Sequence, residues 1–197
     1  TKPNSGTHKL TSSISLNTLL KEYLKISKTT KETKFILNNG KVRVDGKVRK
    51  DHKFSIGLMD VIQIEDVDAH YRVLYDQKGR FLIQSINKED AKIKPRKIIN
   101  KKTLKGKKTQ INLNDGYNIL SETKDYKTND TLIFGLLDNK IKNHIKFEEG
   151  TIVYIIEGNK KGMYGELKKV NKNKNLQTST IIFTKGNENF ETRREFA

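Results

Sequence analysis

The segment from 38 to 51 constrains the fold more than any other, because it joins a hairpin turn to strict alternation of side chains. Asp45-Gly46 lies between two short runs of alternating valines and cations, and an Asp-Gly pair in that setting predicts a two-residue turn with positive φ. Side chains alternate sides along a strand, so Val42, Val44 and Val48 should face a core while the cations face outward. The segment therefore predicts a basic β-hairpin whose cations can meet phosphates.

The charge of the whole chain points the same way. Forty Lys and Arg against 23 Asp and Glu give a net charge of +17, an excess that a free globular protein rarely needs. An AT-rich genome explains the preference for Lys over Arg, but it favours Glu codons as well and leaves the net excess unexplained. The composition thus favours a nucleic-acid partner, with an incidental basic surface as the alternative.

Composition also excludes several classes of protein. The chain has no Cys, which rules out a disulfide framework, a thiolate zinc site and a cysteine nucleophile. No run approaches the length of a membrane-spanning helix, and residues 1–17 lack the apolar stretch of a signal peptide. We therefore expect a soluble, intracellular protein, and an apolar share of only 34% without Trp predicts several small cores.

Two short helices are predicted before the hairpin. Apolar residues recur at helical spacing from 16 to 24, and Ser15 can cap that helix. Thr29 with Glu32 forms a capping box for the second helix, and Gly40 lies where a helix end favours positive φ. After the hairpin, residues 54–64 predict a loop and a closing strand.

The pattern from residue 70 onward is that of strands. We expect them at 71–75, 80–85, 109–113, 117–120, 131–134 and 141–147, with turns at Gln77-Lys78-Gly79 and Asn114-Asp115-Gly116. Between these pairs, residues 92–108 contain nine basic residues and no acid. Such a run is either a solvated loop or a segment that packs partly through its isoleucines and leaves its cations for RNA.

The last part of the chain begins near Glu148 and is rich in glycine. Glycines 158, 162 and 165 allow sharp turns between short barrel strands and a close approach of a nucleic-acid backbone. The alternative is a glycine-rich hairpin without a ligand. Net charge is +6 for 1–67, +9 for 68–147 and +2 for 148–197, which makes the middle part the electrostatic centre.

Catalytic and metal-binding patterns find little support. The four histidines, His8, His52, His70 and His144, are dispersed, so we interpret them as surface or RNA-contacting residues instead of metal ligands. Residues 158–162 are too short for a phosphate-binding loop and lack its Lys-Ser/Thr ending. Asp45 belongs to a hairpin turn, where Asp is common for backbone reasons. We expect no catalysis, no cofactor and no metal.

Several local motifs in this order resemble one family, the archaeal and eukaryotic small-subunit ribosomal protein S-four-e. The similarity covers nearly the whole chain, and its motifs are Gly6 to Leu10, the 45–49 hairpin, 57–62, 71–81, 129–131, 145–147, 150–165 and 190–193. The resemblance implies an α+β chain in which a two-helix plus small-sheet RNA-binding domain precedes two mainly-β, barrel-like domains. Its implied divisions are an extended arm at 1–12, an S-four-type RNA-binding domain at 13–66, a central β-barrel-like domain at 67–147 and a KOW-type small β-barrel at 148–197.

The chain departs from the family pattern at both ends and in the glycine segment. The family's basic N-terminal extension and its further strand and basic tail are absent, which indicates either a reduced lineage or residues outside the given sequence. Lys160, Lys161 and Glu166 stand where the family tends to have apolar or small residues, which weakens the KOW assignment.

The function implied by the resemblance is structural: binding small-subunit ribosomal RNA during assembly and remaining in the particle, beside neighbouring small-subunit proteins. The expected location is the cytoplasmic ribosome, with nucleolar assembly in a eukaryotic source, and no membrane or small-molecule substrate. A transient KOW-containing RNA-binding factor of the ribosome or transcription machinery is the alternative, and an RNA-modifying enzyme is a weaker one. The candidate RNA-binding residues are Lys41, Arg43, Lys47, Arg49, Lys50, Arg72, Lys78, Arg80, Lys92, Lys94, Arg96, Lys97, Lys101, Lys102, Lys105, Lys107, Lys108, Lys160, Lys161 and Arg193.

Overall fold

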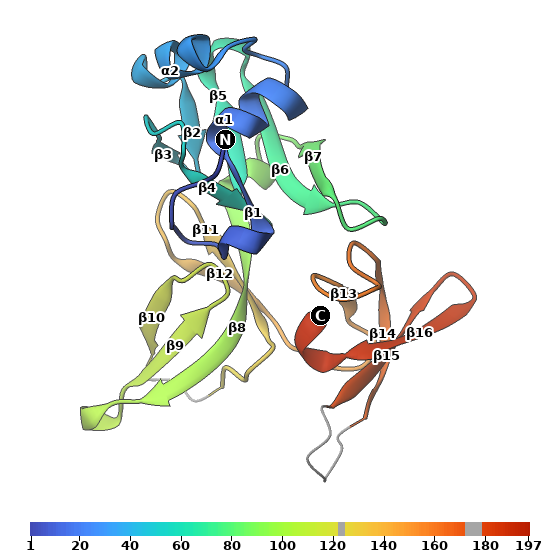
Figure 1. The fold of residues 1–197 in the computed structure, drawn as a ribbon. Helices are drawn as coiled ribbons and strands as arrows, with labels where there is room; N and C mark the ends of the chain where they lie inside the picture. Colours follow the sequence, from blue (N-terminus) through green and yellow to red (C-terminus); the bar gives the residue numbers. More distant parts are fainter. Residues whose placement is uncertain (122–124, 172–178) are drawn as a thin grey trace.

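The computed structural model describes residues 1–121, 125–171 and 179–197, and its strands form three larger sheets and one small one (Figure 1). The helices are α1 (Leu16–Thr18), which continues as the π-helix η2 (Leu19–Tyr23), and α2 (Thr30–Asn38). Short 3-10 turns are η1 (Leu10–Ser12), η3 (Glu65–Val67), η4 (Asp90–Lys92), η5 (Lys105–Lys107) and η6 (Arg194–Phe196). The strands are β1 (Ser13–Ser15), β2 (Val42–Val44), β3 (Lys47–Val48), β4 (Ser55–Gly57), β5 (Val61–Ile64), β6 (Ala69–Tyr75), β7 (Phe81–Ser85), β8 (Ile93–Thr103), β9 (Thr109–Leu113), β10 (Asn118–Ser121), β11 (Thr131–Gly135), β12 (Ile141–Ile145), β13 (Ile152–Tyr154), β14 (Tyr164–Asn171), β15 (Thr180–Lys185) and β16 (Glu188–Arg193).

Both predicted helices are present, and their caps are the ones that the sequence indicates. The Ser15 hydroxyl accepts a hydrogen bond from the Thr18 N–H at 3.2 Å, which satisfies a free donor of the first turn. The Thr29 hydroxyl accepts from the Glu32 N–H at 3.2 Å. Gly40 follows α2 with φ +75°, as a helix end favours.

The N-terminal sheet has the strand order β3-β2-β5-β6-β7 and packs against the two helices. Asp45 and Gly46 both have positive φ, and Val44 pairs with Lys47 across them, which confirms the predicted two-residue turn. Val42 and Val44 are buried in the helix-facing core. Val48 is not: it is 39% exposed, because it pairs with Arg43 across the two-residue turn and so lies on the side of the sheet away from Val42 and Val44.

The strands β6 and β7 continue this same sheet. Val61 to Ile64 pair with Ala69 to Arg72, so the expected boundary between 66 and 67 falls between two hydrogen-bonded strands. The hairpin predicted at 71–85 is present, with Tyr75 opposite Phe81. Strands β1 and β4 form a separate two-stranded sheet in this N-terminal part of the chain.

The central sheet has the order β10-β9-β8-β11-β12, and its longest strand is β8. The basic run at 92–108 is therefore mostly strand, and the solvated-loop interpretation is wrong for 93–103. Ile98 is fully buried in the core of this sheet with Ile111 and Leu113. Beyond Ile98 the hairpin of β8 and β9 runs outward to a free tip (Figure 1); we call residues 99–110 the arm.

The C-terminal sheet has the order β13-β14-β15-β16 and encloses a core of its own, centred on Leu167, Ile181 and Phe183. Gly165 leaves no room for a side chain, since an added Cβ would lie 2.2 Å from the Thr184 carbonyl oxygen. None of the helices in the described ranges is long and apolar enough to cross a membrane.

Candidate nucleic-acid interface

The surface of the β2–β3 hairpin is less uniformly positive than its sequence indicates. The Arg43 guanidinium contacts Glu65 at 2.5 Å, and the Lys41 ammonium contacts Asp66 at 2.5 Å. Both acids come from η3, which directly follows the strand paired with β2. Exposed pairs of this kind contribute little stability, but each one neutralises a cation that we expected to face phosphate.

Lys94 and Arg96 are buried, which corrects their assignment as RNA-contacting residues. The Lys94 ammonium lies 2.6 Å from Asp45, 2.6 Å from Asp60 and 3.6 Å from Asp115. The Arg96 guanidinium contacts Asp115 at 2.7 Å and stacks between the rings of Tyr117 and Phe134. Neither side chain is available to a phosphate. We call Lys94, Arg96, Asp45, Asp60, Asp115 and His8 the Lys94 node.

The node joins the N-terminal sheet to the central sheet. Asp45 comes from the β2–β3 turn, Asp60 from the turn before β5, and Asp115 from the β9–β10 turn, while β8 supplies both cations. Burial and the nearby Asp60 raise the pKa of Asp45 despite Lys94. Burial alone would raise the pKa of Asp60, but Lys94 and His8 outweigh it and lower that pKa to about 2. Burial would lower the pKa of Lys94, and the three carboxylates raise it instead.

The histidines lie deeper than we predicted. His8 Nε2 is 2.9 Å from both carboxylate oxygens of Asp60, and this contact attaches the N-terminal segment 1–12 to the node. His144 contacts the buried Asp130 at 2.8 Å, and His70 is 9% exposed. The surface interpretation is thus wrong for these three side chains. In the described residues no group of three His, Asp or Glu side chains could hold a metal ion.

Six of the twenty candidate cations are exposed and have no acidic partner in the part of the chain that the structure describes. They are Lys47, Lys50, Lys78, Lys102, Lys105 and Lys108. The last three lie in the arm. Its other lysines differ: Lys101 donates to the Tyr126 carbonyl, and the side chain of Lys107 lies outside the described part.

Eleven further candidates contact other groups of the protein itself. Surface ion pairs engage five of them: Lys41, Arg43, Arg80 with Asp76, Lys92 with Glu89, and Arg193 with Glu195. Backbone carbonyls accept from Arg72, Lys97 and Lys101, and aromatic rings lie under Arg49, Lys160 and Lys161. Three of the six free cations therefore lie in the arm, and most of the other candidates already contact groups of the protein itself.

The C-terminal sheet is fixed to the N-terminal one near Tyr75. The Tyr154 hydroxyl accepts from the Tyr75 N–H at 2.8 Å and donates to its carbonyl at 3.0 Å. The Lys161 ammonium lies 3.6 Å from the centre of the Tyr75 ring. Gly162 packs against Asp76, the residue after Tyr75, because a Cβ at position 162 would lie 1.8 Å from the Asp76 carbonyl oxygen.

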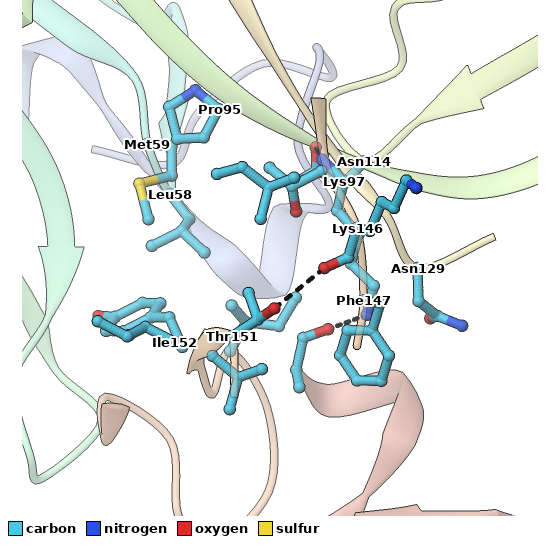
Figure 2. Close-up of a pocket in the computed structure, with 16 residues that line it drawn as sticks. Leu58, Met59, Pro95, Lys97, Asn114, Asn129, Lys146, Phe147, Thr151 and Ile152 are labelled. Carbon is cyan, nitrogen blue, oxygen red and sulfur yellow. Dashed lines mark hydrogen bonds between the residues drawn. The ribbon is translucent and has the colours of Figure 1, made fainter. Parts of the chain in front are cut away.

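All three sheets meet at a pocket of about 210 Å³ (Figure 2). Leu58 and Met59 line it from the N-terminal part, Pro95 and Lys97 from β8, and Ile152 from β13. Burial and the nearby Arg194 lower the pKa of Lys97 to about 8. Its position makes Lys97 a junction residue and not a free surface cation.

Two helices on an antiparallel sheet, followed by two more β-sheets and a lysine-rich arm, define an α+β class of small multi-sheet proteins. A family model described as Ribosomal family S4e matches residues 67–141. The small ribosomal subunit protein eS4 of Methanosphaera stadtmanae is 40% identical over 182 residues, which cover 92% of this chain and 75% of that protein. The eS4 of Methanocella arvoryzae is 36% identical, covering 99% of this chain and 82% of that protein. The chain belongs to the ribosomal family S4e.

A solved structure has the same fold. The crystal structure of the 30S ribosomal protein S4e from Thermoplasma acidophilum is similar with a TM-score of 0.82 and 31% sequence identity, and covers 94% of this chain and 93% of that chain. The α+β fold class expected from the sequence is confirmed.

Proposed function

We propose that this chain is a structural constituent of the small ribosomal subunit and binds its ribosomal RNA through basic surfaces, during assembly and in the mature particle. One observation carries this conclusion: similarity over more than nine tenths of the chain to archaeal proteins named small ribosomal subunit protein eS4. The family is one of ribosomal proteins, and we propose no catalytic role.

The geometry supports an RNA partner for specific residues. Lys102, Lys105 and Lys108 are exposed at the arm, and no acid occurs between Asp90 and Asp115. Lys47 and Lys50 provide a second exposed group at the β2–β3 hairpin. Contacts of this kind go mostly to phosphates and give affinity without reading sequence. Other small-subunit proteins are the proposed neighbours, and the cytoplasmic ribosome is the proposed location.

The division into domains stays a proposal, with an arm at 1–12, an S-four-type RNA-binding domain from 13, a central β-barrel-like domain to 147 and a KOW-type barrel at 148–197. The separate core of the C-terminal sheet supports the last division. The pairing of β5 with β6 favours extending the first domain through β7, to residue 85.

Sedimentation of the tagged protein in a sucrose gradient tests the proposed function. A structural constituent should follow the small subunit and remain with it through a high-salt wash. A transient factor would leave the subunit in that wash, and a protein found only at the top of the gradient would contradict any stable place in the ribosome.

A further inference from the structure

The outer side of the central sheet carries a row of amide side chains. Asn112 of β9 lies opposite Asn100 of β8 and Asn118 of β10, so the three side chains point to one side of the sheet. Ile111 and Leu113, the neighbours of Asn112, are buried in the core. Because side chains alternate along a strand, the asparagine row points away from that core.

The next outward row extends this surface toward the tip of the arm. Lys102 and Leu120 lie on either side of Gln110, and both are exposed. The side-chain amide Nε2 of Gln110 donates to the side-chain oxygen Oδ1 of Asn112 at 3.1 Å. We call Asn100, Gln110, Asn112 and Asn118 the amide face. Neighbouring strands lie about 4.8 Å apart, so its row of three asparagines spans about 10 Å.

The surroundings of the amide face are basic and free of exposed acids along its own strands. Residues 91–114 and 116–121 contain no Asp or Glu. The Asp115 side chain between them is buried against Arg96 and Lys94. Lys102 lies beside Gln110 of the face, and Lys105 and Lys108 lie beyond it at the arm tip. At the end of the face away from the arm tip lies a groove of about 580 Å³ whose lining includes Ile99, Glu157 and Glu195. These two carboxylates repel a polyanion, so we expect it to bind at the end of the face near the arm tip.

Amides on the outer face of a sheet suit one kind of nucleic-acid surface. Each Asn or Gln side chain can both donate and accept a hydrogen bond. The minor groove of A-form RNA is wide and shallow and displays 2′-hydroxyl groups, which also donate and accept. The side-chain oxygen Oδ1 of Asn100 accepts a hydrogen bond from the Lys101 backbone N–H, so the side-chain NH₂ group of Asn100 can donate to a ligand.

We propose that the amide face binds the minor groove of a double-stranded RNA segment, with its amides on 2′-hydroxyl groups and the three arm lysines on the flanking phosphates. This proposal rests on the proposed function, because it names the form of RNA and the groups that the central sheet contacts. The amides make the contact specific for ribose, whereas the lysines supply affinity for any polyanion.

Binding to two short duplexes of one sequence tests the proposal: an RNA duplex and the same duplex with 2′-O-methyl riboses, which keeps the charge and removes the hydroxyl donors. The parent protein should bind the unmodified duplex about tenfold more tightly, as one or two net hydrogen bonds allow. The triple variant Asn100→Ala, Asn112→Ala, Asn118→Ala should bind both duplexes equally. Its affinity should keep the salt dependence of the parent, because no charge has changed.

Two controls make the result decisive. The variant Gln84→Ala, Asn87→Ala removes exposed amides from β7 and the following loop, and should keep the parent's preference. Asn118→Ala alone, at an exposed edge-strand position, should lose part of the preference even if the triple variant fails to fold. A parent that binds RNA without preferring the unmodified duplex overturns the proposal, as does an amide-face variant that keeps the preference; either result leaves the face to a protein neighbour. A parent that binds no RNA at all contradicts the proposed function itself.

Discussion

Lys94 shows how a single side chain can reverse the role that its residue type indicates. In the sequence it belongs to a run of nine cations, yet in the structure it is 2% exposed and contacts two carboxylates at 2.6 Å. A buried pair of this kind is costly to break, since removing one partner leaves an uncompensated charge. Lys94 therefore stabilises the contact between two sheets instead of serving a ligand.

Replacing Lys94 by Met should destabilise the protein by about 3–5 kcal/mol, because Asp45 and Asp60 would remain buried without their cation. Chemical denaturation measures the change in the free energy of unfolding. Lys92→Met is the matched control: among the described residues its ammonium pairs only with the exposed Glu89, and its loss should change stability by less than about 0.5 kcal/mol. Equal stability of the two variants would contradict the structural role of the node.

Lys97 provides a pH-dependent prediction. Its pKa is lowered to about 8 in the folded chain by burial and by Arg194, whereas an unfolded chain keeps the ordinary value near 10.4. Between these values the unfolded state binds more protons, so this residue's contribution makes the folded state more stable as the pH rises and is lost as the pH falls through 8.

Denaturation of the parent and of Lys97→Met at pH 7 and pH 10 isolates this contribution. The difference in free energy of unfolding should shift in favour of the parent at the higher pH. Lys102→Met, which removes an exposed lysine from the same strand, controls for loss of charge. A parent-to-variant difference that does not change with pH would show that Lys97 is solvated.

At the scale of elements, local patterns in the sequence predict turns and helices well. The Asp45-Gly46 turn, the Ser15 and Thr29 caps and the β9–β10 hairpin all follow from short-range chemistry. Period-two alternation also holds a signal that we did not use: Lys94 and Arg96 share the parity of the buried Ile98. That parity places both cations on the inner side of β8.

The partners of these cations could not be predicted in the same way. Asp60 and Asp115 lie in separate turns, 34 residues before Lys94 and 19 residues after Arg96, and only the pairing of distant strands brings them together. Likewise, the acids at 65 and 66 reach Arg43 and Lys41 because β5 pairs with β2. A charge count along the sequence therefore overestimates the cations that remain free.

The arm should account for a large part of the salt dependence of RNA binding. Each phosphate contact contributes about 0.7–0.9 to the slope of log affinity against log salt concentration, so replacing Lys102, Lys105 and Lys108 by Ser should reduce the slope by about 2. A matched set, Lys41→Ser, Lys142→Ser and Lys168→Ser, removes three lysines that already contact acids. Titrations with small-subunit RNA over a range of salt concentrations compare the two sets, and a larger loss of slope in the control set would refute this role of the arm.

At the scale of the whole molecule, contacts at Tyr75 and Gly162 set the position of the C-terminal sheet. Gly162→Ala should displace that sheet, because the new Cβ would overlap the Asp76 carbonyl. Small-angle scattering should then show a larger radius of gyration. Gly186→Ala is the control, since Gly186 also has positive φ but has nothing within 4 Å of an added Cβ; it separates backbone strain from the contact. An unchanged radius in Gly162→Ala would mean that the sheets are positioned by other contacts.

The Lys94 node also determines an order of events during synthesis of the chain. A ribosome builds from the N-terminus, so Asp45 and Asp60 emerge 49 and 34 residues ahead of the lysine that pairs with them. Asp115, the last carboxylate of the node, emerges later still. The first sheet can thus pair its strands early, but Asp45 and Asp60 lack the ammonium of Lys94 until β8 has been made. The N-terminal sheet therefore completes its buried ion pairs only after β8 and the β9–β10 turn have been made.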